Sequence, residues 1–236
     1  MSGVKLAIRY GYVPCKLGLC GPKDKERKKI INRFLNGEKK LKGRIKKILK
    51  EFKGAYPYYQ LIARSNKITD SLNQKVVEAY WLGNPLLDKV KVSDFKKMMA
   101  KEFLPLGKVP EARIKKLPKK AISLHNFHVL AIGSVTGRFQ ETKKGLDFCR
   151  ISWGKINNIF PNKIEVIRQP LQFSKKIILG KAEKKIISWN RNILPEIKKG
   201  DWVSIHWNTA IEILNKEKLK NIIKYNQKTL VAINKK

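Results

Sequence analysis

The chain has 236 residues, of which 42% are hydrophobic and 30% are charged. This length suits one large domain or two small ones, and the hydrophobic share is typical of a globular protein rather than a disordered one. Lysine and arginine total 53 against 18 aspartates and glutamates, which gives a net charge of +35.

This charge has two interpretations. It is typical of a protein that binds nucleic acid or another polyanion. It also follows from composition alone, because lysine, isoleucine and asparagine are abundant along the whole chain. In both cases we expect association with acidic partners to be fast and sensitive to salt.

Neither a membrane span nor a disulfide framework is expected. No apolar run approaches the ~18–20 residues that a span needs, and the N-terminus lacks the apolar core and cleavage site of a secretory signal. The three cysteines, Cys15, Cys20 and Cys149, are too few and odd in number for a set of disulfides. We therefore expect a cytoplasmic protein.

Residues 1–104 are predicted to form a helical domain. Gly21-Pro22 followed by Asp24 is typical of a helix start, and Asp70-Ser71 and Ser93 are predicted caps for later helices. Apolar residues then recur at helical spacing on one face of each segment. The predicted helices cover residues 24–35, 41–52, 55–68, 72–82 and 94–104.

Residues 105–121 contain three prolines and many lysines, which predicts a linker with one short helix. From residue 122 onward the apolar pattern changes to a period of two, with turn residues between short runs. The predicted strands cover residues 127–132, 148–153, 163–168, 176–179, 185–189 and 201–207, and a helix is predicted near 215–233.

The predicted fold class is therefore α+β. A helical domain at 1–104 and a linker at 105–121 precede a small antiparallel β-barrel with a C-terminal helix at 122–236. The barrel is expected to be of the OB-like type, because several short strands separated by Gly, Pro and Asn turns suit a small barrel.

The three histidines are the groups expected to titrate near neutral pH. His125 and His128 stand three apart within a predicted strand, so they would face opposite sides. They are either satisfied by backbone hydrogen bonds or ligands of a metal ion. Cys149 and His206 each lie in a predicted strand, and Cys20 is a further candidate.

Two segments resemble the [NiFe]-hydrogenase maturation chaperones of the HypC/HupF type. Cys149 begins a run that continues to Gly154 and Lys155, similar to the cysteine strand of that family. The run Gly200-Asp201-Trp202-Val203-Ser204-Ile205-His206, followed by Trp207, is similar to its Gly-Asp-aromatic-Val-x-x-His strand. In this chain Cys149 is internal, and Trp153 stands where the family has a proline.

This resemblance implies a carrier role. In the chaperone family the cysteine and the histidine hold an iron centre and pass it to a metalloenzyme precursor, which implies iron and a protein partner here. Cys149 and His206 would be the ligands, and a thiolate with an imidazole suits iron. The plain alternative is that Cys149 is a small buried apolar residue and His206 a satisfied strand residue.

The full chain also resembles an uncharacterised prokaryotic family, DUF6390-like, to which no activity is attached. The shared segments are Arg9–Tyr12, Leu17–Pro22, Gly54–Tyr58, Glu78–Asn84, His125–Val129 and Cys149–Gly154.

Two other functions stay open. An OB-like barrel could bind single-stranded nucleic acid if Trp153, Trp202 and Trp207 lay on a surface beside Lys155 and Arg150. An enzyme could use Cys149 as nucleophile with a histidine base, although no orienting carboxylate stands at a recognisable spacing.

The distance between Cys149 Sγ and the nearest ring nitrogen of His206 decides whether these two residues share a site. About 3–5 Å, the span of two ligands on one ion, would favour a shared site.

The helical half concentrates its aromatic side chains between residues 56 and 81. They are expected to form a packed core, with a partner-docking surface or a cofactor pocket as the alternatives.

Overall fold

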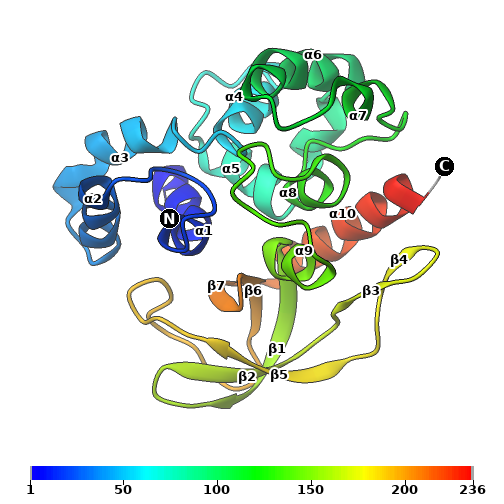
Figure 1. Ribbon diagram of the computed structural model, residues 1–236. Helices are drawn as coiled ribbons and strands as arrows, with labels where there is room; N and C mark the ends of the chain where they lie inside the picture. Colours follow the sequence, from blue (N-terminus) through cyan, green and yellow to red (C-terminus); the bar gives the residue numbers. More distant parts are fainter. Residues whose placement is uncertain (1, 235–236) are drawn as a thin grey trace.

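The structure is a computed structural model that describes residues 2–234. It is a mixed α+β fold, in which a layer of helices lies over a sheet (Figure 1). The C-terminal helix α10 (Lys216–Asn234) leaves the sheet side and runs back against the helical layer, where it contacts α8. Among the described residues no helix is long and apolar enough to cross a membrane.

The first half is helical, as predicted. Its elements are α1 (Gly3–Lys16), α2 (Lys25–Leu35), η1 (Lys39–Leu41), α3 (Lys42–Leu49), α4 (Tyr56–Ser65), α5 (Gln74–Trp81), η2 (Pro85–Lys89), α6 (Val92–Glu102), η3 (Leu104–Leu106) and α7 (Glu111–Lys115). Helix α1 was not predicted. Most of its residues are buried, among them Val4, Leu6, Ile8 and Tyr10.

Local capping explains where several helices begin. The Asp24 carboxylate accepts the Arg27 N–H at 2.8 Å, which confirms the predicted start of α2. The predicted caps at Ser71 and Ser93 are wrong. Asn73 caps α5 by accepting the Lys75 N–H, and Ser93 lies inside α6.

The segment 105–121 contains the predicted short helix, α7. Its side chains Val109, Ile114 and Leu117 are buried in the same apolar core as the helices before it. That core also takes in Ile211 and Ile222 from the C-terminal part. The division into a domain, a linker and a second domain therefore stays a prediction.

The strand predicted over residues 127–132 is wrong. This segment forms α8 (His125–Phe127) and a π-helical turn, η4 (His128–Ile132), which ends at Gly133 with φ +82°. The run is buried on all sides, and hydrophobic periodicity cannot distinguish a buried strand from a buried helix. Helix α9 (Lys143–Cys149) follows, so Cys149 ends a helix and does not begin a strand.

The strands lie between residues 152 and 213. They are β1 (Ser152–Ile159), β2 (Lys163–Arg168), β3 (Leu171–Phe173), β4 (Ile177–Leu179), β5 (Glu183–Ser188), β6 (Trp202–His206) and β7 (Thr209–Ile213). The prediction for residues 163–168 is confirmed, whereas β3 and β7 were not predicted.

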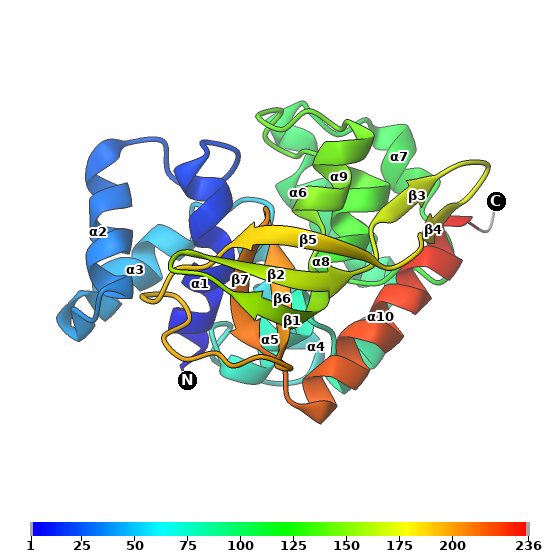
Figure 2. The same cartoon turned by 90° about the horizontal axis from the view of Figure 1, so that it is seen from below.

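Within residues 2–234, five strands form one sheet in the order β1-β2-β5-β7-β6, and β6 pairs back onto β1 (Figure 2). The pairs are antiparallel except for β5 with β7, which pair in parallel at Ser188 and Thr209. Strands β3 and β4 form a separate hairpin.

Two features place the end of β6 beside the end of α9. Strand β1 pairs with β6 so that Ser152 lies opposite Ile205. Trp207 and Asn208 have φ values of +49° and +52°, which is typical of a two-residue type I′ hairpin turn between β6 and β7. The Trp207 N–H donates to the Phe148 carbonyl at 2.8 Å. His206 and Cys149 are consequently neighbours.

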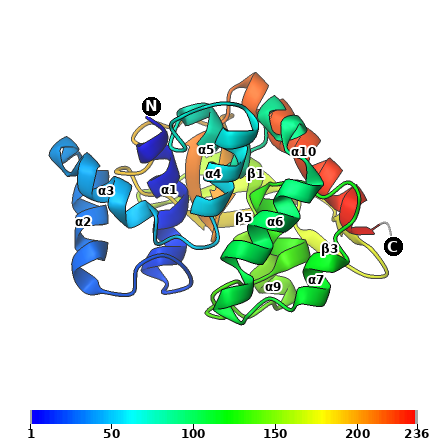
Figure 3. The same cartoon turned by 90° about the horizontal axis from the view of Figure 1, so that it is seen from above.

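The described residues contain two apolar clusters. The larger one fills the helical layer, in which α1, α4 and α5 are central (Figure 3). The smaller one lies inside the sheet and includes Ile156, Ile164, Val166 and Val203. The candidate site described below lies where the helical layer meets the strands.

Gly83, directly after α5, allows α10 to approach closely. Its φ is +87°, and a Cβ there would lie 2.4 Å from the Tyr225 ring. We expect Gly83→Ala to lower the free energy of unfolding by about 2–3 kcal/mol, through backbone strain and overpacking. Gly37→Ala is the control, because φ is +107° but no described atom lies within 4 Å of its Cβ. If urea unfolding showed that Gly83→Ala and Gly37→Ala lose the same free energy of unfolding, the close approach of α10 to Gly83 would be contradicted.

Candidate metal centre

Three potential ligands meet at the boundary between the helices and the strands. One ligand atom each from His125, Cys149 and His206 lies within 4.8 Å of the other two. His125 comes from α8, Cys149 ends α9 and His206 ends β6. The structure therefore brings Cys149 and His206 together, as their shared role requires, and adds His125 from the helical segment.

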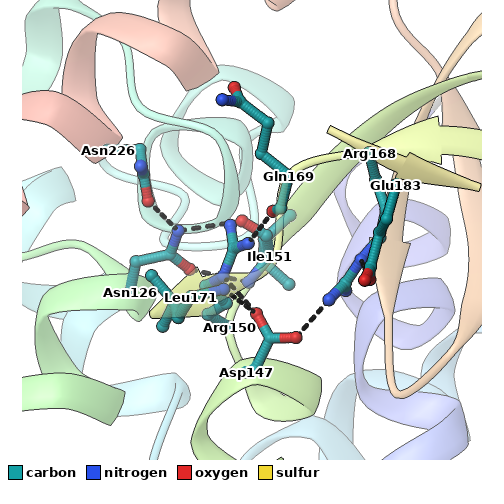
Figure 4. Close-up of polar contacts among 9 residues, drawn as sticks. All are labelled: Asn126, Asp147, Arg150, Ile151, Arg168, Gln169, Leu171, Glu183 and Asn226. Carbon is teal, nitrogen blue, oxygen red and sulfur yellow. Dashed lines mark hydrogen bonds and ion pairs between the residues drawn. The ribbon is translucent and has the colours of Figure 1, made fainter. Parts of the chain in front are cut away.

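Asn126 connects α8 to the chain just after Cys149. Its side-chain oxygen accepts the Ile151 N–H at 2.7 Å, and its amide donates to the Ile151 carbonyl at 2.9 Å (Figure 4). The same amide donates to Asn226 of α10 at 3.1 Å. The two hydrogen bonds between Asn126 and Ile151 hold His125 close to Cys149, because His125 is next to Asn126 and Cys149 is two residues before Ile151.

A buried ionic network holds α9 against the strands. Asp147 pairs with Arg150 at 3.0 Å and with Arg168 of β2, and its Oδ1 also accepts the Leu171 N–H at 2.9 Å (Figure 4). Burial acts to raise the pKa of Asp147, but the two arginines and the hydrogen bonds lower it overall. Since Cys149 stands between Asp147 and Arg150, this network positions its side chain.

His206 presents a bare nitrogen to the cluster. Its Nδ1 lies 2.9 Å from the Tyr10 carbonyl, which only accepts, so Nδ1 carries the proton. Nε2 is buried and makes no hydrogen bond of ordinary geometry with the residues described here, and the backbone of Cys149 lies near this ring. Burial lowers the pKa of His206 to about 4, so the ring is neutral at pH 7 with a free lone pair on Nε2. Outer hydrogen bonds of this kind orient metal-ligating histidines.

His125 is held at both nitrogens. Nδ1 lies 3.1 Å from the Tyr80 hydroxyl, and Nε2 lies 2.9 Å from the Cys149 carbonyl. Burial, and then the neighbouring His206 and His128, lower the pKa of His125 well below its usual range. This ring is therefore neutral as well.

The Cys149 thiol is weakly acidic where it stands. Burial raises its pKa to about 12, so it is protonated at neutral pH in the free protein. A bound cation would reverse this, because metal binding deprotonates a coordinating thiol.

A cavity of about 80 Å³ adjoins the three ligands. A single water needs only ~10–15 Å³ by the same measure. The wall of the cavity is mainly apolar and includes Pro14, Leu19, Phe52, Val129, Val135 and Phe139. Among the residues that the structure describes, no carboxylate lines it. The indole N–H of Trp207, also in the lining, is buried on the side of the Cys149 thiol and acts to lower the pKa of that thiol.

The remaining candidates lie beside this cluster. His128 and Cys20 line the same cavity, but the group of close ligand atoms found among residues 2–234 does not include them. His128 Nδ1 lies 2.9 Å from the Tyr58 hydroxyl. Burial raises the pKa of Cys20 well above its ordinary value.

The residues that support the cysteine and histidine motifs have structural roles. Gly154 lies in β1, where a Cβ would approach Val166 to 3.0 Å, and Lys155 beside it is exposed. Gly200 has φ +92° in the turn before β6, and the Asp201 carboxylate closes that turn by accepting the Lys198 N–H at 2.9 Å.

The aromatic side chains of the helical half form part of the packed core, and some of them also line the cavity. Tyr58, Tyr59 and Tyr80 are fully buried, as the prediction of a packed core requires. Tyr80 and Trp81 also line the cavity, and the Trp81 ring centroid lies 4.5 Å from that of His125. The sequence did not indicate the contact of Tyr80 with His125, nor that of the Tyr10 carbonyl with His206, because both join distant segments.

Two residues of the surface predicted to stack nucleic-acid bases, Arg150 and Trp153, are buried. Arg150 is 1% exposed and Trp153 is 9% exposed. Both side chains are committed to the interior, so they cannot form an exposed stacking surface with Lys155.

Fold and site define a mixed α+β protein with a partly buried cysteine and two buried histidines at a cavity. The sequence model of a family of unknown function, DUF6390, matches residues 1–236. The chain belongs to this family. No curated protein and no solved structure matches the chain.

Proposed function

We propose that this protein is an accessory factor that holds an iron centre through Cys149 and His206 and delivers it to a metalloenzyme precursor. Two observations carry the proposal: a ring nitrogen of His206 lies within 4.8 Å of the Cys149 sulfur, and Nε2 of the same ring is buried without a hydrogen bond from the described residues. A buried acceptor with no partner is costly, and a metal ion would satisfy it.

The donor set fits iron. A thiolate and an imidazole both bind first-row transition metals, and two ligands from this pair leave coordination positions open for transfer. The cavity beside the pair gives space for exogenous ligands on the ion. When bound, the ion would supply the positive charge that keeps Cys149 deprotonated.

The finer fold assignment is part of the same proposal. The order β1-β2-β5-β7-β6, closing on β1, supports an OB-like barrel, which is a five-stranded Greek-key barrel. In this barrel β6 carries the Gly200–His206 motif, and Cys149 precedes β1. Both motif segments therefore stand at one end of the strands, as a barrel similar to that of the HypC/HupF chaperones requires.

The high pKa of Cys149 argues against the enzyme alternative. A thiol nucleophile needs a lowered pKa or an adjacent base held by a third group. Burial raises the pKa of Cys149 to about 12, and burial lowers the pKa of His206 to about 4. A neutral thiol beside a weakly basic imidazole is poorly suited to nucleophilic attack.

The test is iron loading under anaerobic conditions, with bound iron measured after desalting. We expect the unaltered protein to retain iron and Cys149→Ala to lose most of it, because the thiolate is the softest donor. Cys15→Ala is the matched control, since Cys15 is a free, buried cysteine that contacts the Pro22 carbonyl away from the site. Equal iron in the two variants would exclude the proposed role of Cys149.

A further inference from the structure

His125 and Tyr80 take part in three contacts but carry only two protons between them. The Tyr80 hydroxyl contacts both the Gly54 carbonyl and His125 Nδ1, and His125 Nε2 contacts the Cys149 carbonyl. Two of these four partners are carbonyls, which only accept, and a neutral imidazole and a hydroxyl carry one proton each.

Each tautomer of His125 leaves one contact without its proton. If Nε2 carries the proton, it donates to the Cys149 carbonyl and Tyr80 must donate to Nδ1, so the Gly54 carbonyl receives none. If Nδ1 carries the proton, it donates to the Tyr80 oxygen and Tyr80 donates to Gly54. The lone pair of Nε2 then faces the Cys149 carbonyl oxygen at 2.9 Å, which is repulsive.

A cation at Nε2 resolves this conflict. The cation takes the place of the proton on Nε2, and the Cys149 carbonyl, 2.9 Å from Nε2, then turns aside or joins the ligands of the ion. Nδ1–H donates to the Tyr80 hydroxyl, and Tyr80 donates to the Gly54 carbonyl. His206 is held in the same tautomer by the Tyr10 carbonyl. Both imidazoles then present Nε2 and donate Nδ1–H outward, the arrangement usual for metal-ligating histidines.

From this geometry we infer that His125 is a third ligand, and that the protein binds a divalent first-row ion in a thiolate–bis-imidazole site with Tyr80 as a positioning residue. The inference rests on the proposed function and deepens it, because the helical segment supplies one ligand and the strand segment another. Three protein ligands leave a fourth position open, as in metal sites that accept an exogenous ligand. The adjoining apolar cavity is where that ligand would lie.

The chain contains a matched control pair. Tyr58 contacts His128 Nδ1 at 2.9 Å, as Tyr80 contacts His125 Nδ1 at 3.1 Å. Both tyrosines are 0% exposed and both histidines are 7% exposed. His128 lines the same cavity but lies outside the group of close ligand atoms within residues 2–234. The two pairs therefore share burial and the contact between a tyrosine hydroxyl and Nδ1, and only His125 belongs to the group of close ligand atoms.

The experiment is titration of the full-length, metal-free protein with Co²⁺ under anaerobic conditions. The near-ultraviolet thiolate-to-cobalt band reports Cys149, and the intensity of the visible d–d bands reports four-coordination. We expect His125→Gln to lower Co²⁺ affinity by more than about 100-fold and Tyr80→Phe by about 10-fold. We expect His128→Gln and Tyr58→Phe to bind as the unaltered protein does.

A ligand role is separated from a structural one by rescue. In His125→Gly, added imidazole is expected to restore the d–d intensity, because it can enter the space that the ring leaves. The third-ligand inference would be overturned if imidazole failed to restore the d–d bands of folded His125→Gly. It would also be overturned if His125→Gln and His128→Gln lost equal Co²⁺ affinity. If His125→Gln binds normally while Cys149→Ala does not, the two-ligand function stands and this inference fails. If the unaltered protein binds neither Co²⁺ nor iron, both fail.

Discussion

Replacing Asp147 by alanine is expected to lower the free energy of unfolding by about 3–5 kcal/mol, the usual cost of leaving a buried charge without its partner. Asp147 is the carboxylate between Arg150 and Arg168, whose side chains are 1% and 3% exposed. Burial lowers the pKa of Arg150 to about 10, but the guanidinium is still charged at pH 7, so removal of Asp147 leaves a buried positive charge without its partner. The measurement is the urea unfolding midpoint and slope.

Two variants isolate the cause. Asp147→Asn keeps an oxygen for the Leu171 N–H and removes only the charge, so most of the loss is expected to remain. Glu111→Ala removes a carboxylate whose pair with Lys115 is exposed, 62% and 72%, and is expected to cost less than about 1 kcal/mol. A loss in Asp147→Ala no larger than that of Glu111→Ala would show that the network contributes little.

The network also connects stability to the site. Asp147 and Arg150 flank Cys149, so loosening α9 displaces the thiol from both histidines. We therefore expect Asp147→Asn to weaken metal binding although its side chain is not a proposed ligand.

Acidification is expected to destabilise the metal-free protein between pH 6.5 and about 4. Burial lowers the pKa of His128 and of His206 from 6.5 to about 4. The unfolded chain therefore binds protons that the folded chain does not, and stability that is present above pH 6.5 is lost as the pH falls toward 4. A pKa difference of this size corresponds to about 3 kcal/mol for each histidine.

The contributions of His128 and His206 together are comparable with the whole free energy of unfolding of many domains, about 5–15 kcal/mol. The loss begins above the range in which Asp147 titrates, because the pKa of that carboxyl is lowered below 3.8. His128→Gln removes one titrating ring and keeps a polar group for Tyr58. We expect urea unfolding of this variant to lose about 3 kcal/mol less than the unaltered protein between pH 7 and 4. Identical pH dependence of the two proteins would contradict a buried neutral His128.

Much of the chain's local structure could be predicted from its sequence. Asp24 caps α2, strand 163–168 has its predicted bounds, and a C-terminal helix forms near residues 215–233. These elements obey local rules, because a cap bonds within three residues and a half-buried strand or helix shows its period in the apolar pattern. Cys149 and His206 became candidates in another way, through the resemblance of their flanking segments to the HypC/HupF chaperones.

Tertiary packing decided the rest. Segment 127–132 is mostly buried, so its sequence carries no period that distinguishes a helix from a strand. The helical form of residues 125–132 brings His125 to Cys149, and the type I′ turn at Trp207 brings His206 to the same place. The protonated nitrogen of His206 is set by the Tyr10 carbonyl, and Nδ1 of His125 contacts the Tyr80 hydroxyl; both partners are distant in sequence. Hydrogen bonds between segments so far apart leave no local pattern, and only the folded chain determines them.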